Sequence, residues 1–463
     1  NRARFPLAVL RRVKEEIGKE LAVTIKMNGS DFVEGGITLD EAKETARIFE
    51  QGGVDAITVS AATDSTLYMS IQPAVFPRGC LVPLAQGVKS VVAVPVVAVG
   101  RINDPQFAEA ILAEGKADLV AMGRSLICDP ELPRKVAEGR PEDIRPCVAC
   151  STACTEGGQR GGVMSCISNG QAGREGIAKI VPTKHKRRVL VVGGGPAGME
   201  AARVAAIRGH KVTLCEKSAR LGGLLNAGSV PPHKYELPNL VRYFTRQLEK
   251  LGVEVRTGRE VDVKTLEELA PDVVVVATGG QATVLPTNAQ RVFTVSAADA
   301  LTGEATLGHR VAVVGASSTG CETAEYLAEK GHAVTVLEML DDYATDLRPE
   351  IKRLLGERMA HLGVEMLLGC KVTAVRQGEV AYERAGPFVR DLALAHGRHL
   401  AAEQHLDAQM SHPLPEQSLD LRAQIGGIVV QHLQHRDRVA FLRKVLRRLA
   451  PGTAGPHDGD SMP

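Results

Sequence analysis

The chain has 463 residues, and at roughly 150 residues per domain its length predicts about three domains. Its 56 basic and 54 acidic residues leave a formal net charge of +2, which argues against nucleic acid or an anionic membrane as the main partner. The sequence shows no apolar run of about 18 residues, the length that spans a membrane. Since no signal peptide is visible either, we expect a cytoplasmic protein.

Residues 1–140 alternate short apolar runs with amphipathic segments, which predicts four strand–helix units of a parallel sheet. We expect strands at Leu21–Met27, Ala56–Ser60, Val94–Gly100 and Leu119–Gly123, and helices at Leu39–Gln51, Leu81–Val91, Pro105–Ala113 and Glu131–Glu138. Four such units make half of a (β/α)8 barrel, whose full length is about 250 residues. We therefore interpret residues 1–145 as the second half of a barrel, and the start at Asn1 as a cut through it.

Glycine and arginine follow the third and fourth of these strands, where barrels of this type hold a phosphate. Glycine amides and arginine forks suit a phosphate dianion, so we expect Gly100, Arg101, Gly123 and Arg124 to bind one. Lys26, at the end of the first strand, would face the same mouth and stabilise negative charge on a reduced flavin.

Residues 146–184 contain four of the nine cysteines, spaced Cys-x2-Cys-x3-Cys-x11-Cys, namely Cys147, Cys150, Cys154 and Cys166. Four soft ligands on a flexible loop favour a [4Fe-4S] cluster. Zinc and unligated thiols remain the alternatives, although zinc sites more often pair two Cys-x2-Cys elements. The other five cysteines are scattered, and we interpret them as small buried side chains.

Two glycine turns follow apolar strands, one in residues 185–305 and one in 306–382. The first carries the full G-x-G-x-x-G pattern. It is followed about 20 residues later by an acid that can accept from a ribose, and then by a further glycine whose backbone can approach the cofactor closely. These residues are Gly193, Gly195, Gly198, Glu216 and Gly223. The second has Gly315, Ser317 and Gly320, with Glu338 at the end of its partner strand. An acid there repels a 2′-phosphate, which favours NADH over NADPH.

With these motifs in place, the chain resembles the iron–sulfur flavoprotein NADH:flavin oxidoreductases related to old yellow enzyme. This family includes 2-enoate reductase, 2,4-dienoyl-CoA reductase and trimethylamine dehydrogenase. The resemblance covers about residues 1–380 and rests on the cysteine spacing, both glycine turns, and four short segments: Asn1–Pro6, Ile25–Met27, Val99–Ile102 and Met122–Arg124.

The resemblance implies an α/β fold with the C-terminal half of an FMN barrel, an iron–sulfur segment, and FAD- and NAD-binding Rossmann-like domains. It implies FMN at Lys26, Arg101, Gly123 and Arg124; a [4Fe-4S] cluster on the four cysteines; FAD at Gly193, Gly195, Ala197, Gly198 and Glu216; and NADH at Gly315 and Glu338. The usual proton-donor tyrosine would precede Asn1, so no catalytic residue is assigned.

Two further departures from the family pattern matter. Ala62–Thr66 has no histidine where the dienoyl-CoA reductases carry one, which favours the enoate-reductase branch. Residues 383–463 do not match the expected return to the FAD domain; we interpret them as a divergent, disordered tail that follows a change of reading frame or a misassembly near residue 383. The histidines of this tail lack the partners that would complete a metal site.

The function that follows is an enzyme that passes electrons from NADH through FAD, the cluster and FMN to the activated C=C bond of a small enoate or enone. Two alternatives stay open: an electron-transfer module that serves a partner protein, and an inactive fragment of such a reductase. The sequence does not name the substrate, and it leaves self-association open.

Overall fold

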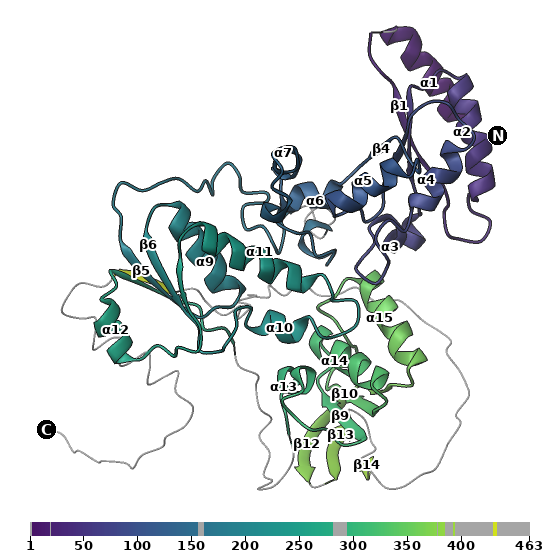
Figure 1. Ribbon diagram of the computed structural model, residues 1–463. Coiled ribbons are helices and arrows are strands. Elements are labelled where there is room, and N and C mark those ends of the chain that lie inside the picture. Colours follow the sequence, from purple (N-terminus) through teal and green to yellow (C-terminus); the bar gives the residue numbers. More distant parts are fainter. Residues whose placement is uncertain are drawn as a thin grey trace, which may run out of the picture.

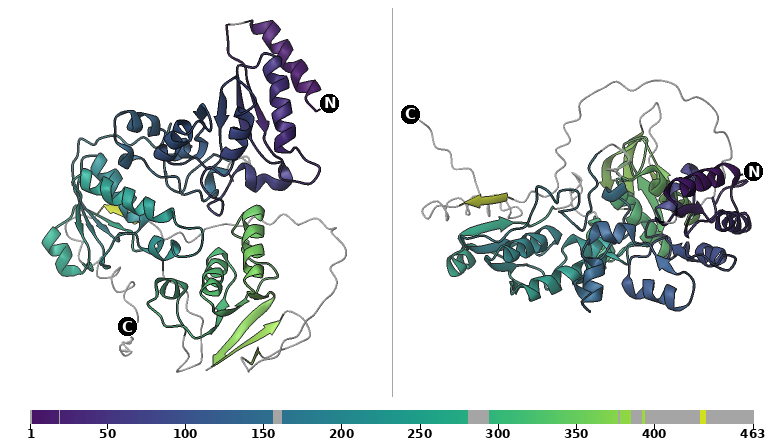
Figure 2. Two further views of the ribbon diagram at one scale, coloured as in Figure 1. Left: turned by 45° about the vertical axis from the view of Figure 1, so that its right-hand side comes forward. Right: turned by 90° about the horizontal axis from the view of Figure 1, so that it is seen from above.

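The computed structural model describes residues 2–18, 20–155, 162–280, 294–376 and 378–384, together with the backbone of 392–393 and 429–432. Three lobes, each built on a mainly parallel sheet, follow one another along the chain (Figures 1 and 2). We call them the barrel lobe (within 2–145), the first nucleotide lobe (within 185–280, joined by 429–432) and the second nucleotide lobe (within 294–384, joined by 392–393). The cysteine-bearing segment connects the first two.

The barrel lobe contains a four-stranded parallel sheet in the order β1-β2-β3-β4. Its strands are β1 (Thr24–Asn28), β2 (Ala56–Ser60), β3 (Val96–Ala98) and β4 (Leu119–Val120). Its longer helices are α1 (Arg4–Ile17), α2 (Leu39–Gln51), α4 (Val82–Lys89) and α5 (Pro105–Ala113), and its short ones are α3 (Leu67–Ser70), α6 (Gly123–Cys128) and α7 (Leu132–Ala137). The predicted strand–helix alternation is confirmed.

Helices cover only one face of this sheet. Ile57 and Val59 of β2 are fully buried and pack in one core with α2 and α4. Thr58 between them points to the opposite face, because side chains alternate along a strand. The register places Lys26 of β1 and Val97 of β3 beside Thr58, and Leu119 of β4 follows beside Val97. Lys26 and Leu119 are exposed, so this face is open in the described chain.

Two strands end earlier than the sequence predicted. Gly100 and Arg101 after β3 both have positive φ, 106° and 53°, which no strand adopts. Gly123 begins α6 instead of ending β4. Helix α1 was not predicted; it buries Leu10 and exposes both charged residues and the apolar side chains of Phe5 and Val9. By contrast, α2 begins and ends as predicted, with a capping box between Thr38 and Glu41.

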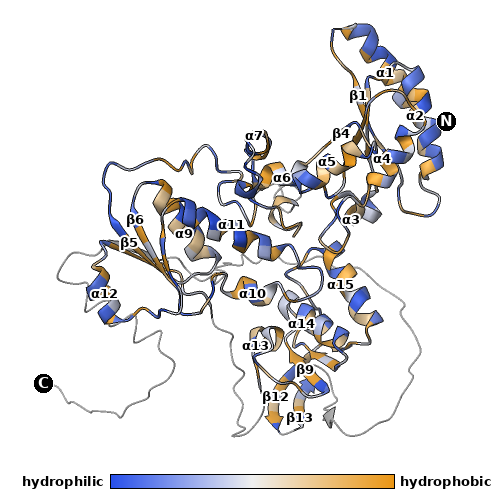
Figure 3. Cartoon of the chain, viewed as in Figure 1, coloured by the Kyte–Doolittle hydropathy of each residue, from blue (hydrophilic) through white to orange (hydrophobic). Residues whose placement is uncertain are grey.

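The first nucleotide lobe has a five-stranded sheet in the order β15-β8-β5-β6-β7, in which only β15 is antiparallel. Its strands are β5 (Arg188–Val192), β6 (Lys211–Cys215), β7 (Glu254–Arg256), β8 (Val273–Val276) and β15 (Val429–His432). Its helices are α9 (Pro196–Ile207), α10 (Leu224–Gly228), α11 (Leu237–Lys250) and α12 (Val263–Leu269). Figure 3 shows β5 and β6 as hydrophobic and α12 as largely hydrophilic, as expected of a buried sheet with a solvated helix.

The second nucleotide lobe pairs a parallel sheet, β11-β10-β9, with an antiparallel one, β12-β13-β14. The strands are β9 (Arg310–Val314), β10 (Ala333–Leu337), β11 (Glu365–Leu367), β12 (Cys370–Arg376), β13 (Glu379–Arg384) and β14 (Leu392–Ala393). The helices are α13 (Ala297–Thr302), α14 (Ser318–Glu329) and α15 (Pro349–His361). Apart from β14 and β15, the predicted tail beyond Arg384 lies outside the described residues. None of the described helices combines the length and the apolar character needed to cross a membrane.

Candidate cofactor-binding sites

The turn between β5 and α9 has the backbone that a dinucleotide-binding loop requires. Gly193 has a φ of 109°, and a Cβ on it would lie 2.2 Å from the carbonyl oxygen of Ala277. A Cβ on Gly198 would lie 1.9 Å from the carbonyl oxygen of Gly193. No side chain fits at either position, so the first and third glycines are required by the fold itself.

The middle glycine differs from the other two. Gly195 has an ordinary φ of −72°, and the space around an added Cβ is empty to 4 Å. Gly223 approaches it closely, since a Cβ on Gly223 would lie 3.0 Å from the Cα of Gly195. Ala197 is the second residue of α9. A pyrophosphate binds where unobstructed backbone and a helix N-terminus lie together, as they do in this turn.

Glu216 lies immediately after β6 and is nearly buried, with 7% of its surface exposed. One carboxylate oxygen accepts from the amide of Gly194 at 2.6 Å, and the other accepts from the amide of Ser218 at 2.8 Å. The acid is thus held against the glycine turn, at the end of the strand where a ribose is read in such folds.

The second glycine turn repeats this geometry. Gly315 has a φ of 96°, and a Cβ on Gly320 would again lie 1.9 Å from a carbonyl oxygen, that of Gly315. Glu338 accepts from the amides of Ala316 at 2.6 Å and Leu340 at 2.9 Å. Ser317, in place of the middle glycine, has a φ of −64°, so its side chain causes no backbone strain.

The two turns differ at the first residue of their helices. Helix α9 begins with Pro196, which has no N–H to donate. Helix α14 begins with Ser318, whose amide and hydroxyl both donate to Asp346, at 2.9 and 2.5 Å. A carboxylate therefore lies at the second helix N-terminus, where the phosphates of a nucleotide would approach.

The four predicted cysteines line one pocket. Cys147, Cys150, Cys154 and Cys166 share it with the side chains Arg124, Ile127, Val148, Ser151, Ile167 and Ser168. Val148 and Cys150 pack against the core of the first nucleotide lobe, while the Cys147 carbonyl accepts from Asn103 of the barrel lobe at 2.8 Å. The pocket thus lies between these two lobes. Ala149 and Ser151 have positive φ, 51° and 50°, which lets the loop wrap tightly.

The residues of this pocket fit an iron–sulfur cluster. The donor set is four thiols, and the hydroxyl of Ser168 on the wall is buried without a partner in the described chain. Among the described residues no three His, Cys, Asp or Glu side chains converge on a single ion. Four thiols on one loop are the donor set of a [4Fe-4S] cluster, and zinc remains the alternative.

Two of these thiols are reluctant to ionise because they are buried. Burial raises the pKa of Cys147 to about 11 and also raises the pKa of Cys154, whereas a hydrogen bond with Cys128 lowers the pKa of Cys166. Metal ligation must therefore displace protons. Cys128 is one of the five cysteines interpreted as small buried residues; it is buried, but it also lies beside a predicted ligand, which the sequence spacing did not indicate.

The two arginines predicted to bind phosphate contact different parts of the chain. The guanidinium of Arg124 donates to Ser151 in the cysteine loop and to the Gln72 carbonyl, both at 2.7 Å. Arg101 is buried against Glu236 of the first nucleotide lobe at 2.6 Å. Gly123 is free of close neighbours, while a Cβ on Gly100 would meet Leu81 at 2.7 Å.

Lys26 lies on the open face of the barrel lobe. It makes no ion pair or hydrogen bond within the part of the chain that the structure describes. An unpaired cation on a strand in this position is available to a ligand above the sheet, but the structure does not bring it together with Arg101, whose charge is buried elsewhere.

Glu236 was missed by the sequence analysis. This buried residue precedes α11 and accepts from three groups of the barrel lobe: Arg101 at 2.6 Å, Asn103 at 2.8 Å and Arg78 at 3.0 Å. No motif indicates a residue whose partners lie more than 130 positions away in the sequence.

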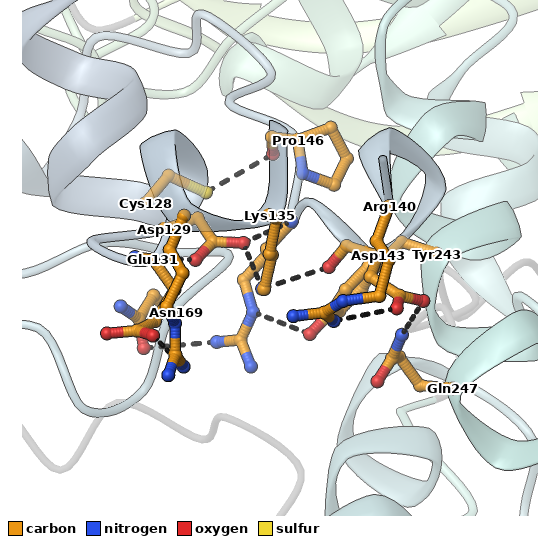
Figure 4. Close-up of polar contacts among 12 residues, drawn as sticks. Cys128, Asp129, Glu131, Lys135, Arg140, Asp143, Pro146, Asn169, Tyr243 and Gln247 are labelled. Carbon is orange, nitrogen blue, oxygen red and sulfur yellow. Dashed lines mark hydrogen bonds and ion pairs between the residues drawn. The ribbon is translucent and has the colours of Figure 1, made fainter. Parts of the chain in front are cut away.

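A second polar network connects the end of the barrel lobe, just before the cysteine segment, to α11 (Figure 4). Asp143 accepts from Gln247 at 3.2 Å and from Arg140 at 3.0 Å, and it also pairs with Lys250. Asp129 accepts from Lys135 at 2.6 Å. In the same view the Cys128 thiol points to the Pro146 carbonyl. These contacts fix the entrance to the cysteine loop.

Comparison with known proteins explains why the barrel lobe is followed by the two nucleotide lobes. Residues 1–143 match the NADH:flavin oxidoreductase / NADH oxidase family, and residues 187–408 match the pyridine nucleotide-disulphide oxidoreductases. An NADH oxidase of Thermoanaerobacter brockii is 39% identical over 430 residues, which cover 91% of this chain and 66% of the relative. The chain belongs to the NADH:flavin oxidoreductase / NADH oxidase family.

Other family members are similarly related. A cinnamate reductase of Clostridium sporogenes is 35% identical and shares 74% of this chain and 53% of its own length. A solved 2-naphthoyl-CoA reductase in complex with 2-naphthoyl-CoA is 33% identical, with a TM-score of 0.78 over 85% of this chain and 60% of that one. The chain thus spans between about half and two thirds of these relatives. The resemblance and the fold class inferred from the sequence are confirmed, and the second match extends 25 residues past residue 383.

Proposed function

We propose that the chain carries electrons from NADH through FAD, a [4Fe-4S] cluster and FMN to an activated carbon–carbon double bond of an enoate or enone. The observation that carries the proposal is the position of the four-cysteine pocket: Arg124 and Ile127 of the barrel lobe line it, and Val148 and Cys150 of its own loop pack against the core of the first nucleotide lobe. A cluster there would supply one-electron steps between two flavin sites that lie in different lobes.

The chain's own residues would hold the groups as follows. Backbone amides around Gly195 and Ala197 would bind the pyrophosphate of FAD, and Glu216 would accept from its ribose. Glu338 does the same for NADH and disfavours a 2′-phosphate by charge repulsion. Lys26 supplies positive charge on the open face of the barrel lobe, where FMN would bind.

The names of the relatives support the substrate class. Cinnamate, which one relative reduces according to its name, is itself an enoate, and a second relative is named for the reduction of 2-naphthoyl-CoA. Both carry a carbonyl conjugated to unsaturated carbon. This shared chemistry favours a conjugated acid, ester or ketone as the electron acceptor of this chain.

An anaerobic titration of the full chain with NADH tests the proposal. FMN, FAD, iron and labile sulfide are first measured per chain, and both flavins should then bleach. Cys147→Ser should lose iron and sulfide and bleach only FAD, while Cys370→Ser, far from the pocket in β12, should behave as the parent. Equal bleaching of FMN in the Cys147 variant would refute the relay.

One observation favours the second candidate, an electron-transfer module for a partner protein. Ile167, next to a predicted cluster ligand, is 53% exposed, and Val163 and Met164 nearby are 69% and 45% exposed. The cysteine pocket thus reaches the surface beside an apolar patch. Rapid NADH oxidation with artificial acceptors, and none with enoates or enones, would support this candidate over the first.

A further inference from the structure

One hydroxyl on the wall of the cysteine pocket has no partner among the described residues. It belongs to Ser168, which lies two residues after Cys166, lines the pocket and is only 4% exposed. The other hydroxyl on the wall, that of Ser151, accepts from Arg124 at 2.7 Å. Because a buried hydroxyl without a hydrogen bond lowers the stability of the fold, a serine at this position indicates a partner inside the pocket.

The backbone of Ser168 is held from outside the pocket. The amide of Asn169 donates to the Cys166 carbonyl at 3.2 Å, which closes a turn with Ser168 inside it. Arg145, which is not among the residues that line the pocket, donates to the Ser168 carbonyl at 2.9 Å and to the Asn169 side chain at 3.0 Å. Arg145 is itself buried, with its guanidinium 5.4 Å from the centre of the Tyr243 ring. The carbonyl of Ser168 is thus engaged away from the pocket, while its hydroxyl forms part of the pocket wall.

The chemistry of the pocket determines what this hydroxyl can donate to. Neutral thiols are weak acceptors, and the described pocket has no carboxylate on its wall. When cysteines ligate a cluster they are thiolates, and these sulfurs and the inorganic sulfides carry negative charge. Hydrogen bonds to charged acceptors are the stronger ones. A cluster would therefore bring the acceptor that the Ser168 hydroxyl lacks.

We propose that the hydroxyl of Ser168 donates a hydrogen bond to a sulfur of the cluster and thereby raises the reduction potential of the cluster. Reduction adds one electron, which in the proposed function comes from NADH through FAD, and the serine proton stays on Oγ. Since the reduced cluster carries one more negative charge, the hydrogen bond stabilises it more than the oxidised cluster. The inference rests on the proposed function, because that function places a cluster in this pocket.

Potentiometric titration of the full chain, with the reduced cluster followed by electron paramagnetic resonance, tests this inference. Ser168→Ala removes the hydroxyl, and Ser168→Thr keeps it. Ser125→Ala is the matched control, because Ser125 is also buried but donates to the Ile102 carbonyl at 3.4 Å and is not part of the pocket wall. Electron–nuclear double resonance after exchange into D2O detects the exchangeable protons beside the cluster. Iron and labile sulfide are measured per chain for every variant.

In Ser168→Ala the ratio of reduced to oxidised cluster at a fixed potential is expected to fall about fivefold, the effect of one hydrogen bond of ordinary strength. One exchangeable-deuteron signal should disappear in the same variant. Ser168→Thr and Ser125→Ala should stay near the parent in both measurements. If Ser168→Ala holds a complete cluster and either its potential or its deuteron signals are those of the parent, the inference is overturned.

The inference and the proposed function fail in different ways. If the parent binds no iron and sulfide, the proposed function is refuted and the inference with it. Should Ser168→Ala bind no cluster, Ser168→Thr decides. A complete cluster with the parental potential in the threonine variant supports the inference, because the hydroxyl is then what the cluster requires. Loss of the cluster from both variants would assign position 168 to packing and overturn the inference.

Discussion

Arg101 and Glu236 form an ion pair that is buried on both sides, with 0% and 2% of the two side chains exposed and 2.6 Å between Nη2 and Oε1. The arginine follows β3 of the barrel lobe, and the glutamate precedes α11 of the first nucleotide lobe. Tyr235 adds to the same contact, since its hydroxyl accepts from Arg101 at 2.9 Å. A charge pair between two lobes thus occupies an arginine that the sequence assigned to a flavin phosphate.

Removing one partner of this ion pair should lower the free energy of unfolding substantially. Glu236→Leu leaves Arg101 charged and buried without its carboxylate, so we expect the free energy of unfolding to fall by about 3–5 kcal/mol. Glu142→Ala, which breaks an exposed pair with Arg246, should cost less than about 1 kcal/mol. Urea unfolding of both variants provides the measurement. Equal costs would show that burial of the pair does not matter.

A substitution in either glycine turn should abolish the binding of one nucleotide and leave the other bound. Gly198→Ala places a Cβ 1.9 Å from a backbone oxygen, so the purified chain should lack FAD. Gly320→Ala creates the same clash in the second turn and should abolish NADH binding while FAD is retained. Gly228→Ala, with open space around it, should retain both. Cofactor content and NADH binding by fluorescence distinguish the three, and loss of FAD from the Gly320 variant would contradict the assignment of the two lobes.

Replacement of Asp346 should have opposite effects on the stability of the lobe and on its affinity for NADH. Asp346→Ala removes the acceptor of the Ser318 amide at the start of α14, so the second nucleotide lobe should lose about 1 kcal/mol. It also removes a negative charge from the place where the nucleotide phosphates approach, so NADH should bind more tightly. Asp342→Ala, which breaks the pair with Lys352 instead, should leave NADH affinity unchanged. Weaker NADH binding by the Asp346 variant would mean that the acid organises the site and does not compete with the ligand.

Asp143 predicts a dependence of stability on pH. Burial raises the pKa of Asp143, but hydrogen bonds from Lys250 and Arg140 outweigh burial and hold its pKa below the usual value. Stability from a carboxylate with a lowered pKa is present above the unfolded value of about 3.9 and is lost as the pH falls through the folded pKa. Asp143→Asn should therefore be destabilised at pH 6, and the difference from the parent should shrink below about pH 4. A difference that stays constant across this range would exclude the ionised form as its source.

The sequence predicted those parts of the fold that depend on local pattern. Helix α2 and strand β2 have the predicted ends, because apolar periodicity and a capping box define them. Gly193 and Gly198 occupy turns where no side chain fits, so their spacing alone is informative.

Contacts between distant segments could not be predicted. The partners of Glu236 depend on how two lobes meet, and the direction of the Arg124 guanidinium depends on where the cysteine loop folds back. Neither leaves a periodic or spaced signal. Cys128 is likewise separated in sequence from the cysteine that it contacts in the fold.

The contacts of Glu236 limit how the lobes can be recombined. One carboxylate serves Arg78, Arg101 and Asn103, all on the barrel lobe. A chimera that takes its first nucleotide lobe from a flavoprotein without an acid at this point would bury the guanidinium of Arg101 with no counterion and leave Arg78 with Asp104 alone. Exchange of whole lobes within the family therefore requires the glutamate and its three partners to be inherited together.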